Sequence, residues 1–157
     1  EPRLYIDAAQ SVIFPSGSQL SLFVEAAAEG HLYVINEAAQ QVNGLPGYAL
    51  VFPRPDINAG GSRVPGGVPF EVASFEFDSQ QGKEKLFLLL TEAPLDLLES
   101  LHTDEQLRLM DLREIQAVQG FLAEHTRQPA RIEALQDKVR VLEEASVLLR
   151  ELEFSTL

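Results

Sequence analysis

Histidine, serine and carboxylate side chains are the groups in this sequence that could bind a metal, attack a substrate or transfer a proton. The three histidines, His31, His102 and His125, have no spacing typical of metal ligands. Ser62 follows Gly61, but no Gly-x-Ser-x-Gly motif surrounds it and the sequence shows no base beside it. We therefore expect no catalytic residue and no metal site. A hydrolase that uses acidic residues is the least favoured interpretation, because such an enzyme needs its carboxylates paired in a cleft.

A stretch rich in proline and glycine runs from Pro53 to Pro69 and contains four residues of each type. It lacks the Gly-Lys-Ser/Thr ending of a phosphate-binding loop and does not lead into a helix, so turn geometry explains its glycines. Arg54 and Arg63 flank it and could hold an anion, although two solvated arginines are the favoured interpretation. If a ligand site exists, its candidate residues are Tyr33, Phe52, Arg54, Asn58 and Arg63.

The composition excludes several classes of site and partner. The chain has 157 residues, a formal net charge of −12 and no cysteine, which excludes disulfides, iron–sulfur clusters and thiol catalysis. The 12 basic residues are scattered, so we expect no nucleic-acid partner. The longest run of large apolar residues, Leu86 to Leu90, is too short for a transmembrane segment. Because the chain begins with Glu1 rather than Met, we interpret it as a processed fragment or a piece of a longer protein.

The elements that must position these residues change in type near residue 92. Nine of the ten glycines and seven of the nine phenylalanines precede that point. Short runs with a period of two, or with continuous apolar character, predict strands there. The predicted strands are 20–24, 31–35, 48–52, 70–77 and 85–91, with shorter candidates at 4–6 and 12–14. The nearly all-apolar run 85–91 indicates a central strand that is buried on both faces.

After residue 92 the apolar spacing predicts helices. Leucines after Pro94 fit a short helix, and Thr103 with Gln106 forms a capping box that predicts the start of a longer one. The predicted apolar stripe of that helix consists of Leu107, Met110, Ile115, Val118, Phe121 and Leu122. A 3-4 spacing from Ile132 to Leu149 predicts a last helix, which could pack on the sheet or pair with a partner or a second copy.

Short motifs in the first part of the chain form a recognisable order. They are Gly17 with Leu20-x-Leu22-x-Val24, Gly30 to Asn36, Val51-Phe52-Pro53, Asn58-Ala59-Gly60, Val64-Pro65, Phe70, Gly82-Lys83-Glu84 and Pro94-Leu95. In this order and spacing, residues from about 11 to 95 resemble the bacterial domain-of-unknown-function family 4384. Two departures are His31, where the family usually has an aromatic residue, and a longer connection from Glu37 to Ala49.

The resemblance implies a small, mostly β module of larger bacterial proteins, some of them secreted or lipid-anchored. It implies no catalytic residues and no cofactor, because none are defined for the family. An extracytoplasmic location, periplasmic or secreted, is therefore an expectation from the resemblance alone. The helical tail after Pro94 lies outside the matching pattern.

We therefore expect an α+β protein, with an antiparallel β-sandwich or small barrel followed by two or three C-terminal helices. Residues 1–92 form the predicted β-rich module, and residues 93–157 form a helical extension that packs on it or mediates association. The expected function is that of a non-catalytic binding or assembly module, with a protein partner or self-association and no identified small-molecule ligand. The alternative is a structural unit that oligomerises through its helices.

Overall fold

The computed structural model describes residues 12–14, 17, 19–26, 28–76, 82–101, 109–125, 131–135, 138–142 and 147–156. Most of this part of the chain is antiparallel β sheet, and within it α2 is the only helix longer than a single turn. In chain order the elements are β1 (Val12–Phe14), β2 (Gln19–Val24), β3 (Gly30–Val42), β4 (Leu45–Phe52), the 3₁₀ helix η1 (Asn58–Gly60), β5 (Arg63–Val64), β6 (Phe70–Glu76), β7 (Gly82–Thr91), α1 (Asp96–Glu99), α2 (Leu112–His125), β8 (Arg131–Leu135), β9 (Lys138–Leu142) and β10 (Val147–Thr156).

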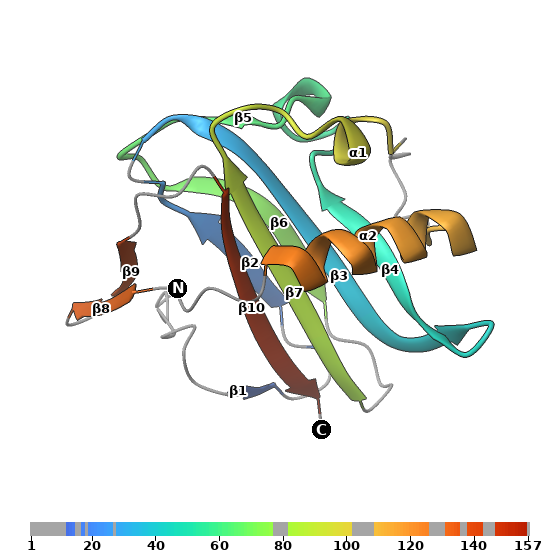
Figure 1. Cartoon of the computed structure of the whole chain (residues 1–157). Helices are drawn as coiled ribbons and strands as arrows, with labels where there is room; N and C mark the ends of the chain where they lie inside the picture. Colours follow the sequence, from blue (N-terminus) through green and yellow to red (C-terminus); the bar gives the residue numbers. More distant parts are fainter. Residues whose placement is uncertain are drawn as a thin grey trace.

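A six-stranded sheet forms the centre of the molecule, with the strand order β1-β10-β7-β3-β4 and with β5 paired to the start of β3. All of its pairings are antiparallel except that of β1 with β10. Strands β2 and β6 form a separate antiparallel pair behind the sheet, while α1 and α2 lie in front of it (Figure 1). The central sheet is therefore covered on both faces.

Strand β7 lies between β3 and β10, as its apolar sequence predicts. Because successive side chains of a strand point to opposite faces, its residues divide between two cores. Phe87 and Leu89 belong to the core beneath the helices, and Leu86 belongs to the core that faces the β2–β6 pair. The prediction that this strand is buried on both faces is confirmed.

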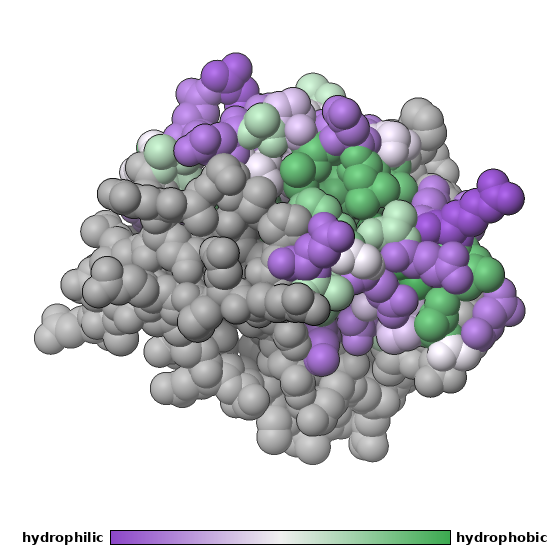
Figure 2. All heavy atoms as spheres, in the orientation of Figure 1, coloured by the Kyte–Doolittle hydropathy of each residue, from purple (hydrophilic) through white to green (hydrophobic). Residues whose placement is uncertain are grey.

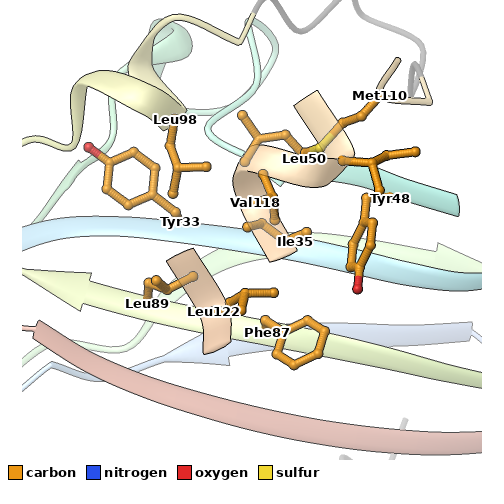
Figure 3. Close-up of a cluster of buried hydrophobic side chains, with 11 residues drawn as sticks. Tyr33, Ile35, Tyr48, Leu50, Phe87, Leu89, Leu98, Met110, Val118 and Leu122 are labelled. Atoms are coloured by element: carbon orange, nitrogen blue, oxygen red, sulfur yellow. The ribbon is translucent and has the colours of Figure 1, made fainter. Parts of the chain in front are cut away.

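The core beneath the helices is built from alternate residues of β3, β4 and β7 together with side chains from the helical segments (Figure 3). Its buried members are Tyr33, Ile35, Tyr48, Leu50, Phe87, Leu89, Leu98, Met110, Ile115, Val118 and Leu122. Four residues of the predicted helical stripe, Met110, Ile115, Val118 and Leu122, are buried here, and Phe121 packs against them. The predicted stripe is thus confirmed within α2, whereas Met110 is buried but precedes the helix.

The second core lies between the central sheet and the β2–β6 pair. Its buried members are Leu32, Val34, Val51, Phe52, Val64, Val72, Ala73 and Leu86. Leu22 and Val24 of β2 pack against it, whereas Phe23 between them is 47% exposed. The outer face of the β2–β6 pair is therefore open to solvent at Phe23.

Strand β3 is longer than predicted because it continues into a hairpin with β4. The turn is formed by Asn43 and Gly44, whose φ angles of 50° and 77° are both positive. A two-residue Asn-Gly turn of this type matches the twist of the flanking strands, so it favours a tight hairpin. This dipeptide explains the long Glu37–Ala49 connection, which is strand and turn rather than loop.

The long helix α2 begins later than predicted. Asp111 accepts a hydrogen bond from the Glu114 amide and Glu114 accepts one from the Asp111 amide, at 2.9 and 2.7 Å. This reciprocal pair is a capping box, and it fixes the start of the helix immediately before Leu112. The predicted start at Thr103 and Gln106 lies outside the described residues.

The predicted last helix over Ile132 to Leu149 is wrong, because the described residues there form strands. Residues 131–135 and 138–142 pair as the β8–β9 hairpin, and β10 pairs with β7 from Val147 to Thr156. The physical reason is visible in Lys138-Val139-Arg140-Val141 of β9 and in Glu151-Leu152-Glu153-Phe154 of β10, where polar and apolar residues alternate with a period of two. Of the two or three predicted C-terminal helices, the described residues thus contain α1 and α2.

Strand β10 also changes the expected division of the chain. It lies between β7 and β1, so the part after residue 92 contributes to the same sheet as the part before it. The extension is therefore not purely helical, and its last strand completes the sheet.

Candidate functional site

The segment around α1 is held on the central sheet by one buried side chain and by a chain of hydrogen bonds. Leu98 is 1% exposed and lies beside Tyr33 in the core (Figure 3). The amide of Leu95, immediately before the helix, donates to the Tyr33 hydroxyl at 2.9 Å. The Tyr33 hydroxyl in turn donates to Glu99 Oε1 at 2.7 Å. Both ends of this single helical turn are thus anchored to β3.

A second arm of the network reaches the same carboxylate from the proline- and glycine-rich loop. Ser62, which precedes β5, donates from Oγ to Glu99 Oε1 at 2.5 Å. His31 Nδ1, at the start of β3, lies 2.8 Å from Ser62 Oγ. Ser62 is 4% exposed, and its backbone oxygen also accepts a hydrogen bond from Leu32. Two segments that are distant in the sequence, β3 and the loop before β5, therefore converge on Glu99 of α1.

The direction of these bonds follows from the inventory of hydrogens. A serine hydroxyl has one hydrogen, and Ser62 gives it to Glu99, so the bond to His31 requires His31 Nδ1 to carry the proton. In a serine nucleophile the hydroxyl instead donates to an unprotonated histidine nitrogen. His31 is thus the neighbour of Ser62 that the sequence did not reveal, and in this geometry it acts as a donor rather than as a base.

The network shifts two ionisation equilibria in opposite directions. Partial burial alone would raise the pKa of the Glu99 carboxyl, but the hydrogen bonds from Ser62 and Tyr33 and the nearby His31 outweigh it and lower this pKa. Burial of the phenol, followed by its hydrogen bond to the Glu99 carboxylate, raises the pKa of Tyr33. Both shifts favour an ionised Glu99 and a neutral Tyr33.

The five candidate residues predicted from the sequence do not come together in one place. Tyr33 and Phe52 are both 0% exposed and belong to the cores on opposite faces of the sheet. Phe52 packs edge-to-face against Phe70, with ring centroids 5.9 Å apart. Neither ring presents a surface to a ligand in this structure.

The other three candidates lie in the loop between β4 and β6, and each contacts its own neighbours. Arg54 makes a two-pronged ion pair with Asp56, at 2.9 and 2.8 Å. The Asn58 amide donates to the backbone oxygens of Gly61 and Arg63. Arg63 pairs with Glu29 on the protein surface. Arg54 thus pairs within the loop, with its side chain 19% exposed, whereas the 73% exposed Arg63 pairs with Glu29 before β3.

Hydrophobic side chains gather on the helix-covered face. Figure 2 shows them concentrated over α1, with a smaller group beside the start of α2 and hydrophilic side chains around both. Leu97 and Leu101 are half-buried, and Leu109 and Leu112 are each 39% exposed. We call these four leucines the leucine surface. The sequence pattern already placed Leu109 and Leu112 outside the buried stripe, but nothing in it revealed Glu99 as an anchor.

The described residues of this face provide no metal site and no membrane-spanning helix. No group of three histidine or carboxylate side chains among them could hold a metal ion. In the same part of the chain, no helix has the length and apolar character needed to cross a membrane. What the face offers is a rigidly held set of leucines beside ionised carboxylates.

Comparison of the chain with protein-family models, curated proteins and solved structures finds no match. The resemblance to family 4384 therefore rests on the sequence motifs alone and stays a prediction.

Proposed function

We propose that this chain is a non-catalytic binding or assembly module that recognises a protein partner through its leucine surface. The observation that carries the proposal is the 39% exposure of Leu109 and Leu112 on the helix-covered face (Figure 1), where the Glu99 network also holds α1 in place. Large apolar side chains that gather on a surface of fixed shape favour a partner, because their burial is favourable and little ordering is needed.

The fold is compatible with the wider expectation. The central sheet with β2 and β6 behind it supports the sandwich form of the predicted architecture. An extracytoplasmic bacterial setting remains part of the proposal and is supported by the family resemblance.

No specific observation favours either alternative function, oligomerisation through the helices or hydrolysis by acidic residues. Oligomerisation through the last helix was argued from the spacing between Ile132 and Leu149, and the described residues there are strands. A hydrolase would need a nucleophile or a pair of carboxylates, and Ser62 donates its only hydrogen to Glu99. The test below includes the oligomeric state, which distinguishes a protein partner from self-association through the leucine surface.

The test is affinity capture from a lysate of the source organism, with the intact chain and two variants as baits. The first variant, Leu109→Gln with Leu112→Gln, makes the exposed part of the leucine surface polar. The matched control, Phe23→Gln, changes a residue of similar exposure on the β2–β6 pair. We expect the intact chain and the control to retain the same protein, and the leucine variant to retain roughly tenfold less of it.

Two results would contradict the proposal. One is equal retention by the leucine variant, with an unchanged circular dichroism spectrum. The other is the absence of any retained protein together with a monomer in light scattering, which would remove both partner binding and self-association.

A further inference from the structure

We propose that the occupant of the leucine surface is a basic amphipathic helix, with an apolar stripe for the leucines and lysine or arginine residues beside it. This inference rests on the proposed function and specifies the chemistry of the partner. It is argued from the charge around the leucines and from the state of the neighbouring sheet edge.

The charge of the helix-covered face is strongly one-sided. The described residues 92–101 and 109–125 include six acidic residues and one basic residue, Arg113. The acidic residues are Glu92, Asp96, Glu99, Asp111, Glu114 and Glu124. Glu99 and Glu114 make hydrogen bonds within the chain, but hydrogen bonding to a carboxylate does not remove its charge. An approaching segment of positive charge is therefore attracted over the whole face.

The same charge argues against two other occupants. A second copy of this chain would bring one acidic face against another, in molecules that each have a net charge of −12. A membrane surface rich in anionic lipids is repelled for the same reason. A basic protein segment meets both the apolar and the electrostatic requirement of the surface.

The sheet edge beside the leucines favours a helix over an added strand. The nearest edge strand is β4, and the chain itself already bridges it, because Ala49 pairs with Leu109. The Met110 amide donates to the Tyr48 oxygen at 2.8 Å. Pro46, within β4, has no amide hydrogen to offer to a further strand. An extended partner would find this edge already bridged at Ala49 and interrupted at Pro46, whereas a helix needs only side-chain contacts.

The test uses a fluorescein-labelled synthetic helix of about 18 residues, with leucines on one face and lysines on the other, and measures binding by fluorescence anisotropy. One comparison peptide has the same composition with the leucines scattered, and a second has the same pattern with glutamate in place of lysine. The proteins are the intact chain, the Leu109→Gln/Leu112→Gln variant, the charge variant Glu92→Gln/Asp96→Asn and the control Phe23→Gln.

We expect the leucine–lysine peptide to bind the intact chain and the Phe23→Gln control equally. The leucine variant should weaken this binding roughly tenfold, and the charge variant roughly threefold. Higher salt should weaken it further, and neither comparison peptide should bind comparably.

Four outcomes would overturn the inference. Equal binding of the scattered peptide shows attraction to net charge only. Binding of the glutamate peptide shows that the acidic face does not select its partner. A dimer of the intact chain that the leucine variant dissociates shows that a second copy is the occupant. If a captured partner depends on the leucines while the leucine–lysine peptide fails to bind, the proposed function stands and this inference alone fails.

Discussion

Glu99 connects more of the structure than any neighbouring residue in its helical turn. One oxygen of its carboxylate accepts hydrogen bonds from Tyr33 and from Ser62, which lie 66 and 37 positions away in the chain. Because α1 has only four residues, it has little helical stability of its own. The position of the adjacent leucines therefore depends on this carboxylate and on buried Leu98.

The ionisation of Glu99 predicts a pH dependence of stability. Its pKa is lowered from the ordinary 4.5 in the folded chain, so its contribution is present above about pH 4.5 and is lost as the pH falls through the lowered value. Glu99→Gln keeps an acceptor oxygen but loses the charge. We expect this variant to lower the free energy of unfolding by about 1 kcal/mol at neutral pH, because the side chain is partly exposed and charged hydrogen bonds there are screened.

Urea unfolding over a series of pH values from about 7 downward measures this difference, which should shrink as the pH falls through the lowered pKa of Glu99. The matched control is Glu124→Gln, an exposed glutamate of α2. If the two variants show the same pH dependence, the network does not stabilise the ionised form of Glu99.

Replacing Gly66 and Gly120 with alanine should change the free energy of unfolding in opposite directions, because Gly66 lies in a loop crossing and Gly120 lies in a helix. A Cβ atom on Gly66 would lie 2.7 Å from the Glu29 amide nitrogen and 2.8 Å from Ala28 backbone atoms, where a loop crosses the chain before β3. A Cβ atom on Gly120, within α2, would meet nothing within 4 Å. We expect Gly66→Ala to lower the free energy of unfolding by about 2 kcal/mol or more, and Gly120→Ala to raise it by up to about 1 kcal/mol.

Urea unfolding of the two variants beside the unchanged chain measures both effects. An unchanged free energy of unfolding for Gly66→Ala would mean that the backbone at Ala28 and Glu29 moves away from residue 66 at little cost. A destabilising Gly120→Ala would mean that this glycine has a role in α2 other than helix propensity.

At the scale of elements, the sequence predicts what depends on local pattern. The strands that contain Leu22, Leu50, Val72 and Leu88 are predicted by a period-two alternation or by a continuous apolar run. The buried stripe of α2 is predicted by the helical spacing of its apolar residues. The β3–β4 hairpin depends on the Asn43-Gly44 turn. The sequence contains this turn signal, but we did not predict a hairpin for the connection from Glu37 to Ala49.

Competing local signals explain the errors. Thr103 with Gln106 and Asp111 with Glu114 both have capping-box chemistry, and only the tertiary structure shows that the second begins α2. The leucines near Leu149 satisfy a helical spacing, yet the sheet offers a vacant edge beside β7 and the segment pairs there. The hydrogen-bond network around Glu99 was not predictable. Glu99 and Ser62 lie 37 positions apart in the chain, so no local sequence pattern links them.

The whole molecule depends on its last strand, so a shortened chain is a direct test of the architecture. A chain ending near residue 128 lacks β10, which pairs with β7 at ten successive positions and also supports β1. Without β10, strand β7 of the central sheet loses one of its two neighbouring strands. We expect this fragment to show no cooperative thermal transition, whereas the intact chain melts cooperatively.

Circular dichroism during heating makes that comparison. A cooperative transition of the fragment near the temperature of the intact chain would mean that residues 1–128 fold independently. Strand β10 would then not be required for the rest of the fold.

The order of synthesis gives the position of β10 a further consequence. While the chain is still emerging from the ribosome, β3 can pair with β4 and with β7, but the other side of β7 has no neighbour until Val147–Thr156 appear. During that interval the run Leu86-Phe87-Leu88-Leu89-Leu90 is an open, highly apolar edge, the kind of surface to which a second nascent chain can add a strand. The synthesis of β10 therefore closes this edge of β7 and at the same time gives β1 its pairing partner.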